Sequence, residues 1–148
     1  MNEQQITDIL RSCLRQVANE QPPLDIASIR ENVVAFRIGV FLEARDEFRE
    51  YIIDSEYNRD VAANDLKRRS TGGAIRPDLV VHKRTGNNED NLLALEVKWS
   101  NSQPEAIQDD RHKLADIKQK YEYPFCVLLI LPRNLDNFSD NATIEFIS

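Results

Sequence analysis

Apolar residues recur at intervals of three and four over residues 3–19 and again over residues 28–48, which is the spacing of one face of an α-helix. The Pro22-Pro23 pair separates the two segments. Two neighbouring stripes of the second segment are apolar: Ile29, Val33, Phe36 and Val40, and then Val34, Ile38, Phe41 and Leu42. We therefore predict two helices, with a wide and largely buried apolar face on the second.

Beyond residue 50 the pattern changes to that of strands, interrupted by one further helix. The predicted strands are 51–57, 79–81, 92–97, 125–131 and 143–147. Gly86-Asn87-Asn88 predicts a hairpin between the second and third, and the run at 125–131 is apolar throughout, as in a strand covered on both faces. Helical spacing returns over 104–120. Residues 60–76 predict a loop, with a short helical turn near 62–68.

The resulting order of elements predicts an α/β domain with a central mixed sheet flanked by helices. A length of 148 residues fits one domain, residues 1–148. No run of about 18 apolar residues is present and residues 1–12 lack the apolar stretch of a signal peptide, so we expect a cytoplasmic protein without a membrane partner. Cys13 and Cys126 are expected to be reduced core thiols.

The net charge of −6, taken alone, argues against a protein that binds polyanions. The charge is unevenly spread, however. Residues 1–58 hold 6 basic and 11 acidic side chains, residues 59–84 hold 7 and 3, and residues 85–148 hold 6 and 11. The basic block is Arg59, Lys67, Arg68, Arg69, Arg76, Lys83 and Arg84. Such a block is usually a solvated loop, but this one leads into the charged residues considered next.

Asp78, Glu96 and Lys98 lie in or beside strongly apolar strands, where unpaired charges are rare. Glu96 and Lys98 share a strand face. A hairpin centred on Asn87 or Asn88 pairs Asp78 with residue 96 or 98, and a hairpin centred between them pairs it near 97. Two carboxylates that close repel unless a proton or a cation lies between them, and Mg²⁺ prefers such oxygen ligands. The alternative is a cross-strand ion pair on an exposed sheet face.

Pro77-Asp78, followed after 17 residues by Glu96-Val97-Lys98, resembles the PD-(D/E)XK nuclease superfamily. The similarity covers about residues 26–131, leaving 1–24 as an N-terminal helical extension, and includes Ile29-Arg30-Glu31 and residues 56–60. The resemblance implies a restriction-endonuclease-like αβββαβ core. It also implies a metal-dependent nuclease that uses Mg²⁺, with Mn²⁺ able to substitute, and we expect its substrate to be DNA rather than RNA.

The resemblance also implies roles for particular residues. Asp78 and Glu96 would be metal ligands together with the backbone carbonyl of Val97, and Lys98 would position the attacking water. Glu31 matches the acid that many family members carry on the upstream helix. Glu31 also fits a capping box with Ser28, and the sequence leaves both interpretations open.

Residues Lys67, Arg68, Arg69 and Arg76 lie in the loop that leads into Asp78 and are candidates for holding nucleic-acid phosphates. Asn58 and Arg59 are further candidates, although polar residues are also common where a strand ends and a loop begins. Lys113 is either an added basic site residue or the partner of Asp109 in an i, i+4 pair. Trp99 is expected to pack on the core.

We expect nucleic acid as the partner, DNA rather than RNA, with a homodimer or a second protein supplying specificity. The alternative is a module that keeps the nuclease fold without catalysis and binds nucleic acid or a protein in a larger assembly.

Overall fold

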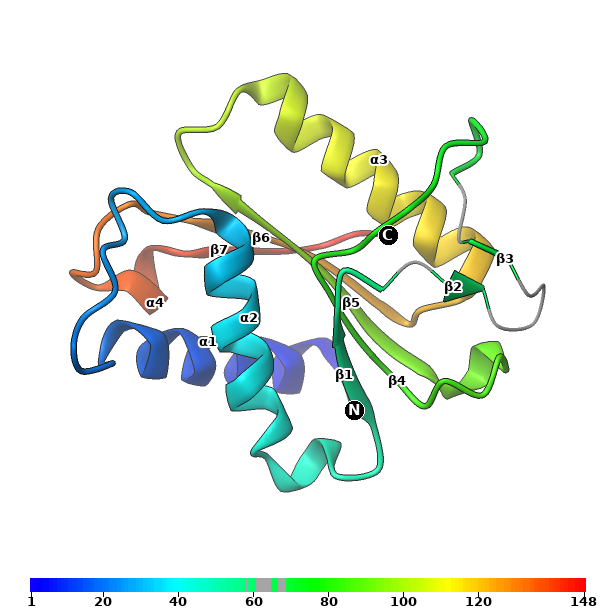
Figure 1. The fold of residues 1–148 in the computed structure, drawn as a ribbon, viewed down its shortest axis with the longest axis horizontal. Helices are drawn as coiled ribbons and strands as arrows, with labels where there is room; N and C mark the ends of the chain where they lie inside the picture. The colour runs from blue at the N-terminus through cyan, green and yellow to red at the C-terminus, as the bar shows by residue number, and fades with distance from the viewer. Residues whose placement is uncertain (58, 61–64, 67–68) are drawn as a thin grey trace.

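Five strands form a mixed sheet with helices on both faces in the computed structural model, which describes residues 1–57, 59–60, 65–66 and 69–148 (Figure 1). The helices are α1 (Glu3–Ala18), α2 (Glu31–Glu43), α3 (Pro104–Tyr121) and α4 (Phe138–Asn141), with 3₁₀ turns η1 (Asp46–Phe48) and η2 (Asn88–Asp90). The sheet strands are β1 (Ile52–Ser55), β4 (Leu79–His82), β5 (Asn91–Trp99), β6 (Phe125–Leu131) and β7 (Thr143–Phe146). The predicted α/β class is confirmed.

The strand order is β1-β4-β5-β6-β7, with β5 at the centre. The β4–β5 pair is antiparallel, as the predicted hairpin requires, and aligns Leu79 with Leu95. Strands β5 and β6 are parallel, and α3 makes the crossover between them. Strand β6 is almost entirely buried, as its apolar sequence predicts.

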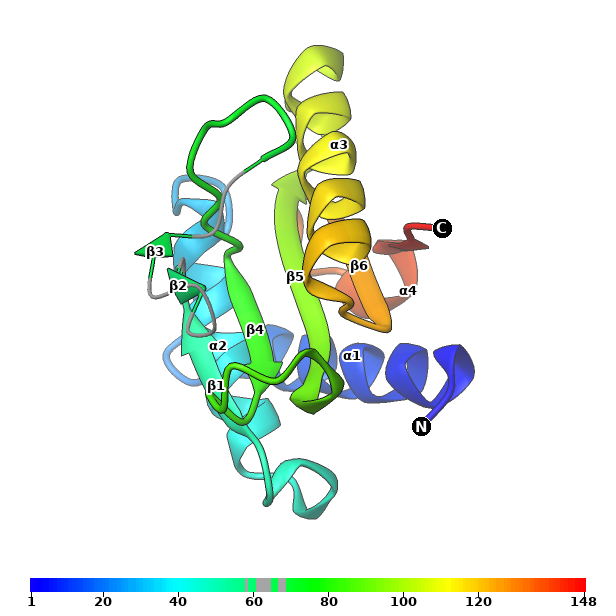
Figure 2. The ribbon, with the colours of Figure 1, turned by 90° about the vertical axis from the view of Figure 1, so that its right-hand side faces the viewer.

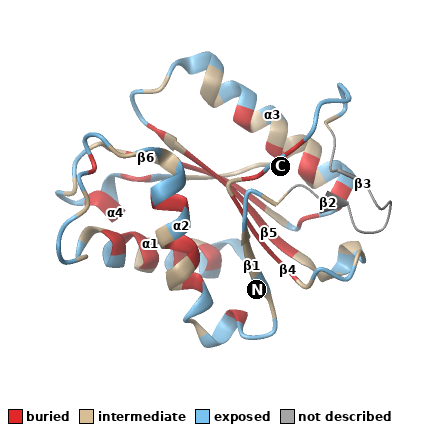
Figure 3. Cartoon of the chain, in the orientation of Figure 1, coloured by how far each residue is buried: buried red, intermediate tan, exposed pale blue. Residues whose placement is uncertain are grey.

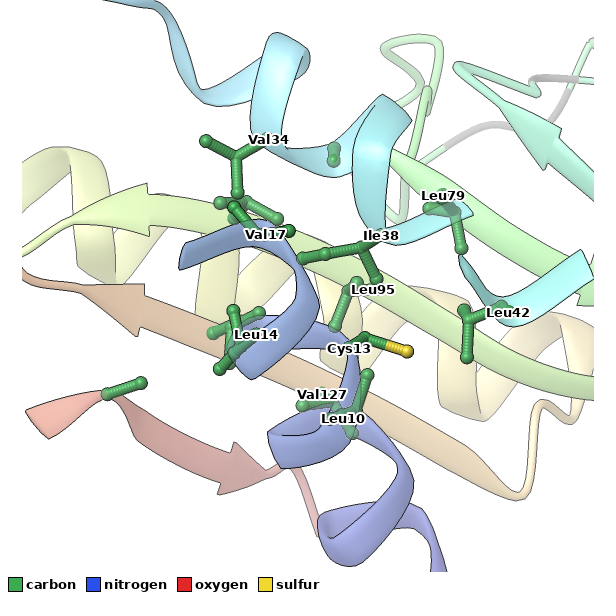
Figure 4. Close-up of a cluster of buried hydrophobic side chains, with 14 of the residues drawn as sticks. Leu10, Cys13, Leu14, Val17, Val34, Ile38, Leu42, Leu79, Leu95 and Val127 are labelled. Atoms are coloured by element: carbon green, nitrogen blue, oxygen red, sulfur yellow. The ribbon is translucent and has the colours of Figure 1, made fainter. Parts of the chain in front are cut away.

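Helices α1 and α2 cover one face of the sheet and α3 covers the other (Figure 2). On the first face, Leu10 and Leu14 of α1 pack with Ile38 of α2 and with Leu95 and Val127 of the sheet (Figure 4). Figure 3 shows that the buried residues follow the central strands and the helix sides turned toward them. Helix α1 therefore belongs to the same core as the segment 26–131.

Helix α2 is shorter than the predicted helix over 28–48. The amide groups of Ser28 and Ile29 both donate to the Asp25 carbonyl in a turn before the helix. At the other end Arg45 is extended, with φ −96° and ψ 137°, and a separate 3₁₀ turn follows. The turn at Asp25 and the extended Arg45 confine the regular α-helix to residues 31–43.

The apolar face of α2 is also narrower than predicted. Val34, Ile38 and Leu42 are buried, but Val33 and Phe36 are 38% and 56% exposed. The helix approaches the sheet through Gly39, where a Cβ atom would lie 2.8 Å from Leu79 Cδ1. This close contact turns Val33 and Phe36 toward solvent, so the prediction of a wide and largely buried face is wrong at these two positions.

A small ribbon of β2 (Arg59–Asp60) and β3 (Asp65–Leu66) replaces part of the predicted loop. The helical turn predicted near 62–68 is wrong at residues 65–66, which pair as a strand, and its remaining positions lie outside the described residues. Cys13 and Cys126 are both buried and free, as expected. Within the described ranges, none of the helices has the length and apolar character needed to cross a bilayer.

Candidate functional site

Asp78 lies directly before β4, at the point where the hairpin register brings it next to β5. Because Leu79 pairs with Leu95, Asp78 comes opposite Glu96. The Val97 amide donates a 2.8 Å hydrogen bond to Asp78 Oδ2. The Glu56 amide and the Ser55 hydroxyl donate to the Asp78 carbonyl, at 3.1 and 3.2 Å. Asp78 is therefore fixed by two donors at the end of β1, the Ser55 hydroxyl and the Glu56 amide, and by the Val97 amide of β5.

Glu96 and Lys98 both project toward α3, since side chains alternate along β5 and Leu95 and Val97 pack on the opposite face. A cleft of about 230 Å³ lies at this end of the sheet. The residues that line it are Arg30, Glu31, Asn32, Glu56, Asp78, Glu96, Val97, Lys98, Asp110 and Lys113. All the predicted catalytic residues and metal ligands thus line one cleft.

Glu31 stands in the first turn of α2 and lines the cleft. The N-cap of α2 is Arg30, which makes no side-chain capping bond, and the Ser28 hydroxyl donates to Asp25. The capping box between Ser28 and Glu31 is therefore not formed. The structure therefore agrees with Glu31 as a residue that lines the cleft and not with Glu31 as a helix cap.

Arg133 anchors the loop that precedes Glu31. Its Nη1 atom donates to the carbonyls of Ile26, Ala27 and Ile29, at 3.4, 3.1 and 3.3 Å. Its guanidinium lies 4.3 Å from the ring centroid of Trp99, which is 1% exposed. Trp99 thus packs on the core as expected, and Arg133 ties the start of α2 to the end of β5.

Replacing Arg133 with Ala should lower the free energy of unfolding by about 1.5–3 kcal/mol, because several carbonyls lose a charged donor. Urea unfolding followed by circular dichroism measures this loss. Arg49→Ala, at an exposed position, is the matched control and should change stability by less than about 0.5 kcal/mol. Equal stability of the two variants would show that the anchor does not hold the loop.

Helix α3 adds two charged side chains, Asp110 and Lys113. Lys113 Nζ lies 2.7 Å from Glu96 Oε1 and 3.3 Å from Asp110 Oδ1. Lys98 Nζ lies 3.2 Å from Asp110 Oδ2. The i, i+4 pair with Asp109 proposed for Lys113 is replaced by these contacts, since Asp109 pairs with Arg69 at 2.9 Å.

Asp110 was not singled out by the sequence, although a signal for it exists. It stands four residues before Leu114 and seven before Ile117, on the buried stripe of α3. An acidic residue on an apolar helix stripe needs a buried partner. Here that requirement is met by Lys98 and Lys113.

The electrostatics of the cleft are dominated by burial and by the opposed carboxylates. Burial raises the pKa of Glu96 well above its ordinary value, and the neighbouring Asp78 carboxylate raises it further. Burial also raises the pKa of Asp78, against the lowering effect of the Val97 amide. Burial lowers the pKa of Lys98 and Lys113, but Asp110 and Glu96 outweigh it, so the pKa of both lysines is raised. The cleft therefore favours charged lysines, and the pKa of Glu96 is raised even though the Lys113 ammonium acts to lower it.

Among the described residues, no three His, Cys, Asp or Glu side chains are grouped so as to enclose a metal ion. Mg²⁺ needs fewer than three protein ligands, since it commonly uses one or two carboxylates and completes its coordination shell with water and phosphate oxygens. Asp78 and Glu96 provide such a pair, and a cationic group, Lys113, already lies against Glu96. The donor chemistry of the cleft thus fits a hard divalent cation.

The predicted phosphate-binding residues are only partly described. Asn58, Lys67 and Arg68 lie outside the described residues, and only the backbone is described for Arg59. The guanidinium of Arg69 is paired with Asp109, which ties its loop to α3, whereas Arg76 is exposed next to Pro77. Two other members of the basic block are also paired: Arg84 with Asp54, and Lys83 with Asp90 at 3.7 Å.

Comparison of the chain with protein-family models, with curated proteins and with solved structures finds no match.

Proposed function

We propose that this protein is a metal-dependent nuclease that hydrolyses phosphodiester bonds, in DNA rather than RNA. The observation that carries the proposal is the convergence of Asp78, Glu96 and Lys98 in one cleft that Glu31 also lines. The order α2, β1, β4, β5, α3, β6 agrees with the αβββαβ core of the PD-(D/E)XK superfamily, which supports a restriction-endonuclease-like fold. We propose membership of that superfamily on the same grounds.

In this proposal Asp78, Glu96 and the Val97 carbonyl hold Mg²⁺, for which Mn²⁺ can substitute. The bound cation supplies Lewis acidity and lowers the pKa of water. Lys98 orients the attacking water by donating a hydrogen bond from Nζ, and Glu31 accepts from water on the α2 side of the cleft. Asp110 holds Lys98 in the cleft until substrate arrives.

The substrate is proposed to be a polyanion because cationic side chains lie at and beside the cleft. Arg30 lines it and is exposed, and Arg76 is exposed two residues before Asp78. Both can pair with phosphates next to the scissile one. We further propose that the protein acts in the cytoplasm, either as a homodimer or with a second protein that supplies specificity.

A second candidate is a module that keeps the nuclease fold but binds nucleic acid or a protein without cleaving. The contacts of Lys113 with Glu96 and of Lys98 with Asp110 favour it, since they neutralise much of the cleft without a metal. Calorimetric titration with Mg²⁺ and Mn²⁺ separates the candidates. A nuclease binds these ions in a way that depends on Asp78 and Glu96, whereas a non-catalytic module does not.

The direct test is incubation of the protein with plasmid, linear duplex, single-stranded DNA and RNA, each with Mg²⁺, Mn²⁺ or EDTA. Cleavage of a DNA substrate that EDTA abolishes is the expected result. Cleavage of RNA alone would contradict the proposed substrate, and no cleavage of any substrate would contradict the proposed activity.

Replacing Lys98 with Ala should lower the cleavage rate by about 10²–10⁴-fold, because the attacking water loses its positioning group. Single-turnover rates on the best substrate measure the effect. Lys120→Ala removes an exposed lysine of α3 and should cleave as the wild type does. A Lys98→Ala variant with wild-type rate would remove Lys98 from the proposed mechanism.

A further inference from the structure

The strongest unexplained feature of the cleft is a lysine in contact with a proposed metal ligand. Glu96 is 2% exposed, and Lys113 Nζ lies 2.7 Å from its Oε1 atom. We propose that Lys113 is an internal counter-ion of Glu96 in the metal-free protein, and that a divalent cation binds to Glu96 by displacing it. This inference rests on the proposed function, because it concerns the same carboxylate.

Lys113 is held inward by the packing of α3. Its neighbour on the outer side, Asp109, is paired with Arg69 from the loop over the helix. The Lys113 side chain is only 19% exposed and reaches Glu96 across the gap between α3 and β5. The pair is thus a contact between two elements, enforced by the fold, and not a local helix pair.

The ammonium and a divalent cation compete for the same site. An ammonium 2.7 Å from Oε1 occupies the position that an inner-sphere cation would need at that oxygen. Like charges this close also repel strongly in a poorly solvated cleft. A cation bound at Oε1 therefore requires Lys113 to move away from this oxygen.

The structure provides a second partner for the displaced lysine. Asp110 Oδ1 lies 3.3 Å from Lys113 Nζ, one helical turn away on the same face of α3. When the ammonium moves away from Glu96 it can keep this existing contact with Asp110, so no buried charge is left unpaired. Asp110 is itself only 5% exposed, so its carboxylate requires a cationic partner both with and without bound metal. Lys113 thus lowers the apparent affinity for metal while keeping the empty cleft neutralised.

Calorimetric titration of the full chain with Mg²⁺ tests the displacement. Lys113→Met removes the competing charge and keeps the length of the side chain, so its Kd for Mg²⁺ should fall by about 10-fold or more relative to wild type. Lys113→Arg keeps the charge and should retain a Kd close to that of the wild type. Lys120→Met, which removes an exposed lysine from the same helix, should leave the Kd unchanged within about 2-fold.

The possible results distinguish the counter-ion role of Lys113 from the proposed nuclease function. Unchanged or weaker binding by folded Lys113→Met, beside normal binding by wild type, would overturn the counter-ion role and leave the proposed nuclease intact. If neither protein binds Mg²⁺, the metal dependence in the proposed function is overturned as well. Circular dichroism checks the fold, and Lys113→Gln, which keeps a hydrogen-bond donor, replaces Lys113→Met if the latter does not fold. Lys113→Gln should also bind Mg²⁺ more tightly than wild type.

Discussion

Replacing Asp78 with Asn should reduce Mg²⁺-dependent DNA cleavage by at least about 10³-fold while leaving the fold intact. The loss follows from removal of one of two carboxylates that would hold the cation. The fold should survive because the side-chain oxygen of Asn accepts the hydrogen bond that the Val97 amide now donates to Asp78 Oδ2. Single-turnover cleavage and thermal unfolding, measured on the same preparation, test both parts.

Asp140→Asn is the matched control for this experiment. Asp140 is an exposed acid of α4, outside the residues that line the cleft, so its amide variant removes the same charge from the molecule. We expect wild-type cleavage from it. Wild-type cleavage by Asp78→Asn would show that the cleft is not the active site.

Replacing Glu96 with Gln should abolish cleavage and at the same time stabilise the metal-free protein, by about 0.5–2 kcal/mol at neutral pH. Burial and the Asp78 carboxylate raise the pKa of Glu96, so the charged form of this side chain opposes folding. Gln has nearly the same shape and no charge to bury. Glu96, whose charge a bound cation would neutralise, thus lowers the stability of the metal-free protein.

The stabilisation by Glu96→Gln should depend on pH with a defined sign. The folded protein holds the Glu96 proton more tightly than the unfolded chain, whose carboxyl group titrates near 4.5. Wild-type stability therefore falls as pH rises from this value to the raised folded pKa, and the variant lacks that fall. Urea unfolding at pH 4, 5, 6 and 7 should show a difference between the proteins that is smallest at pH 4.

Two outcomes would contradict this account of Glu96. A variant less stable than wild type at neutral pH would mean that the contact with Lys113 outweighs the burial of the carboxylate. A difference that does not vary with pH would mean that the carboxyl group does not titrate differently on folding. Glu145→Gln provides a half-buried comparison, since Glu145 pairs with Arg111 at 2.7 Å near the surface.

The hairpin shows how far local sequence can predict a site. A turn centred near Asn87 or Asn88 allowed Asp78 to pair with residue 96, 97 or 98, and the two-residue period of β5 put Glu96 and Lys98 on the same face. The structure selects Glu96, with a register shift between Val81 and His82. The turn limits the register to these few pairings, but Leu79–Val81 and Leu92–Leu95 are apolar at successive positions, so no alternation of apolar and polar residues selects among them. The approach of Asp78 to Glu96 and Lys98 was therefore predictable from the turn, whereas the residue that lies opposite Asp78 was not.

Helix α2 shows a limit of prediction from local sequence. Its apolar pattern allowed two buried stripes, and the pattern around Ser28 allowed a cap that involves Glu31. The structure exposes Phe36 and places Glu31 in the cleft. Both outcomes depend on the close approach at Gly39 and on the anchor from Arg133, which is 102 positions beyond Glu31 along the chain. The spacing of apolar residues within the helix cannot predict either contact.

By itself, the sequence determined the α/β class, helices α1 and α3, the five strands of the sheet and a hairpin that brings Asp78 next to Glu96 and Lys98, because each depends on spacing within one segment or across one turn. It did not predict α4 or the ribbon of β2 and β3. Only the tertiary structure decided the electrostatic partners. The docking of α3 placed Asp110 against both lysines and Lys113 against Glu96, and it paired Arg69 of the basic block with Asp109. Those pairings join segments distant in sequence, and a charged side chain takes whichever partner packing brings within reach.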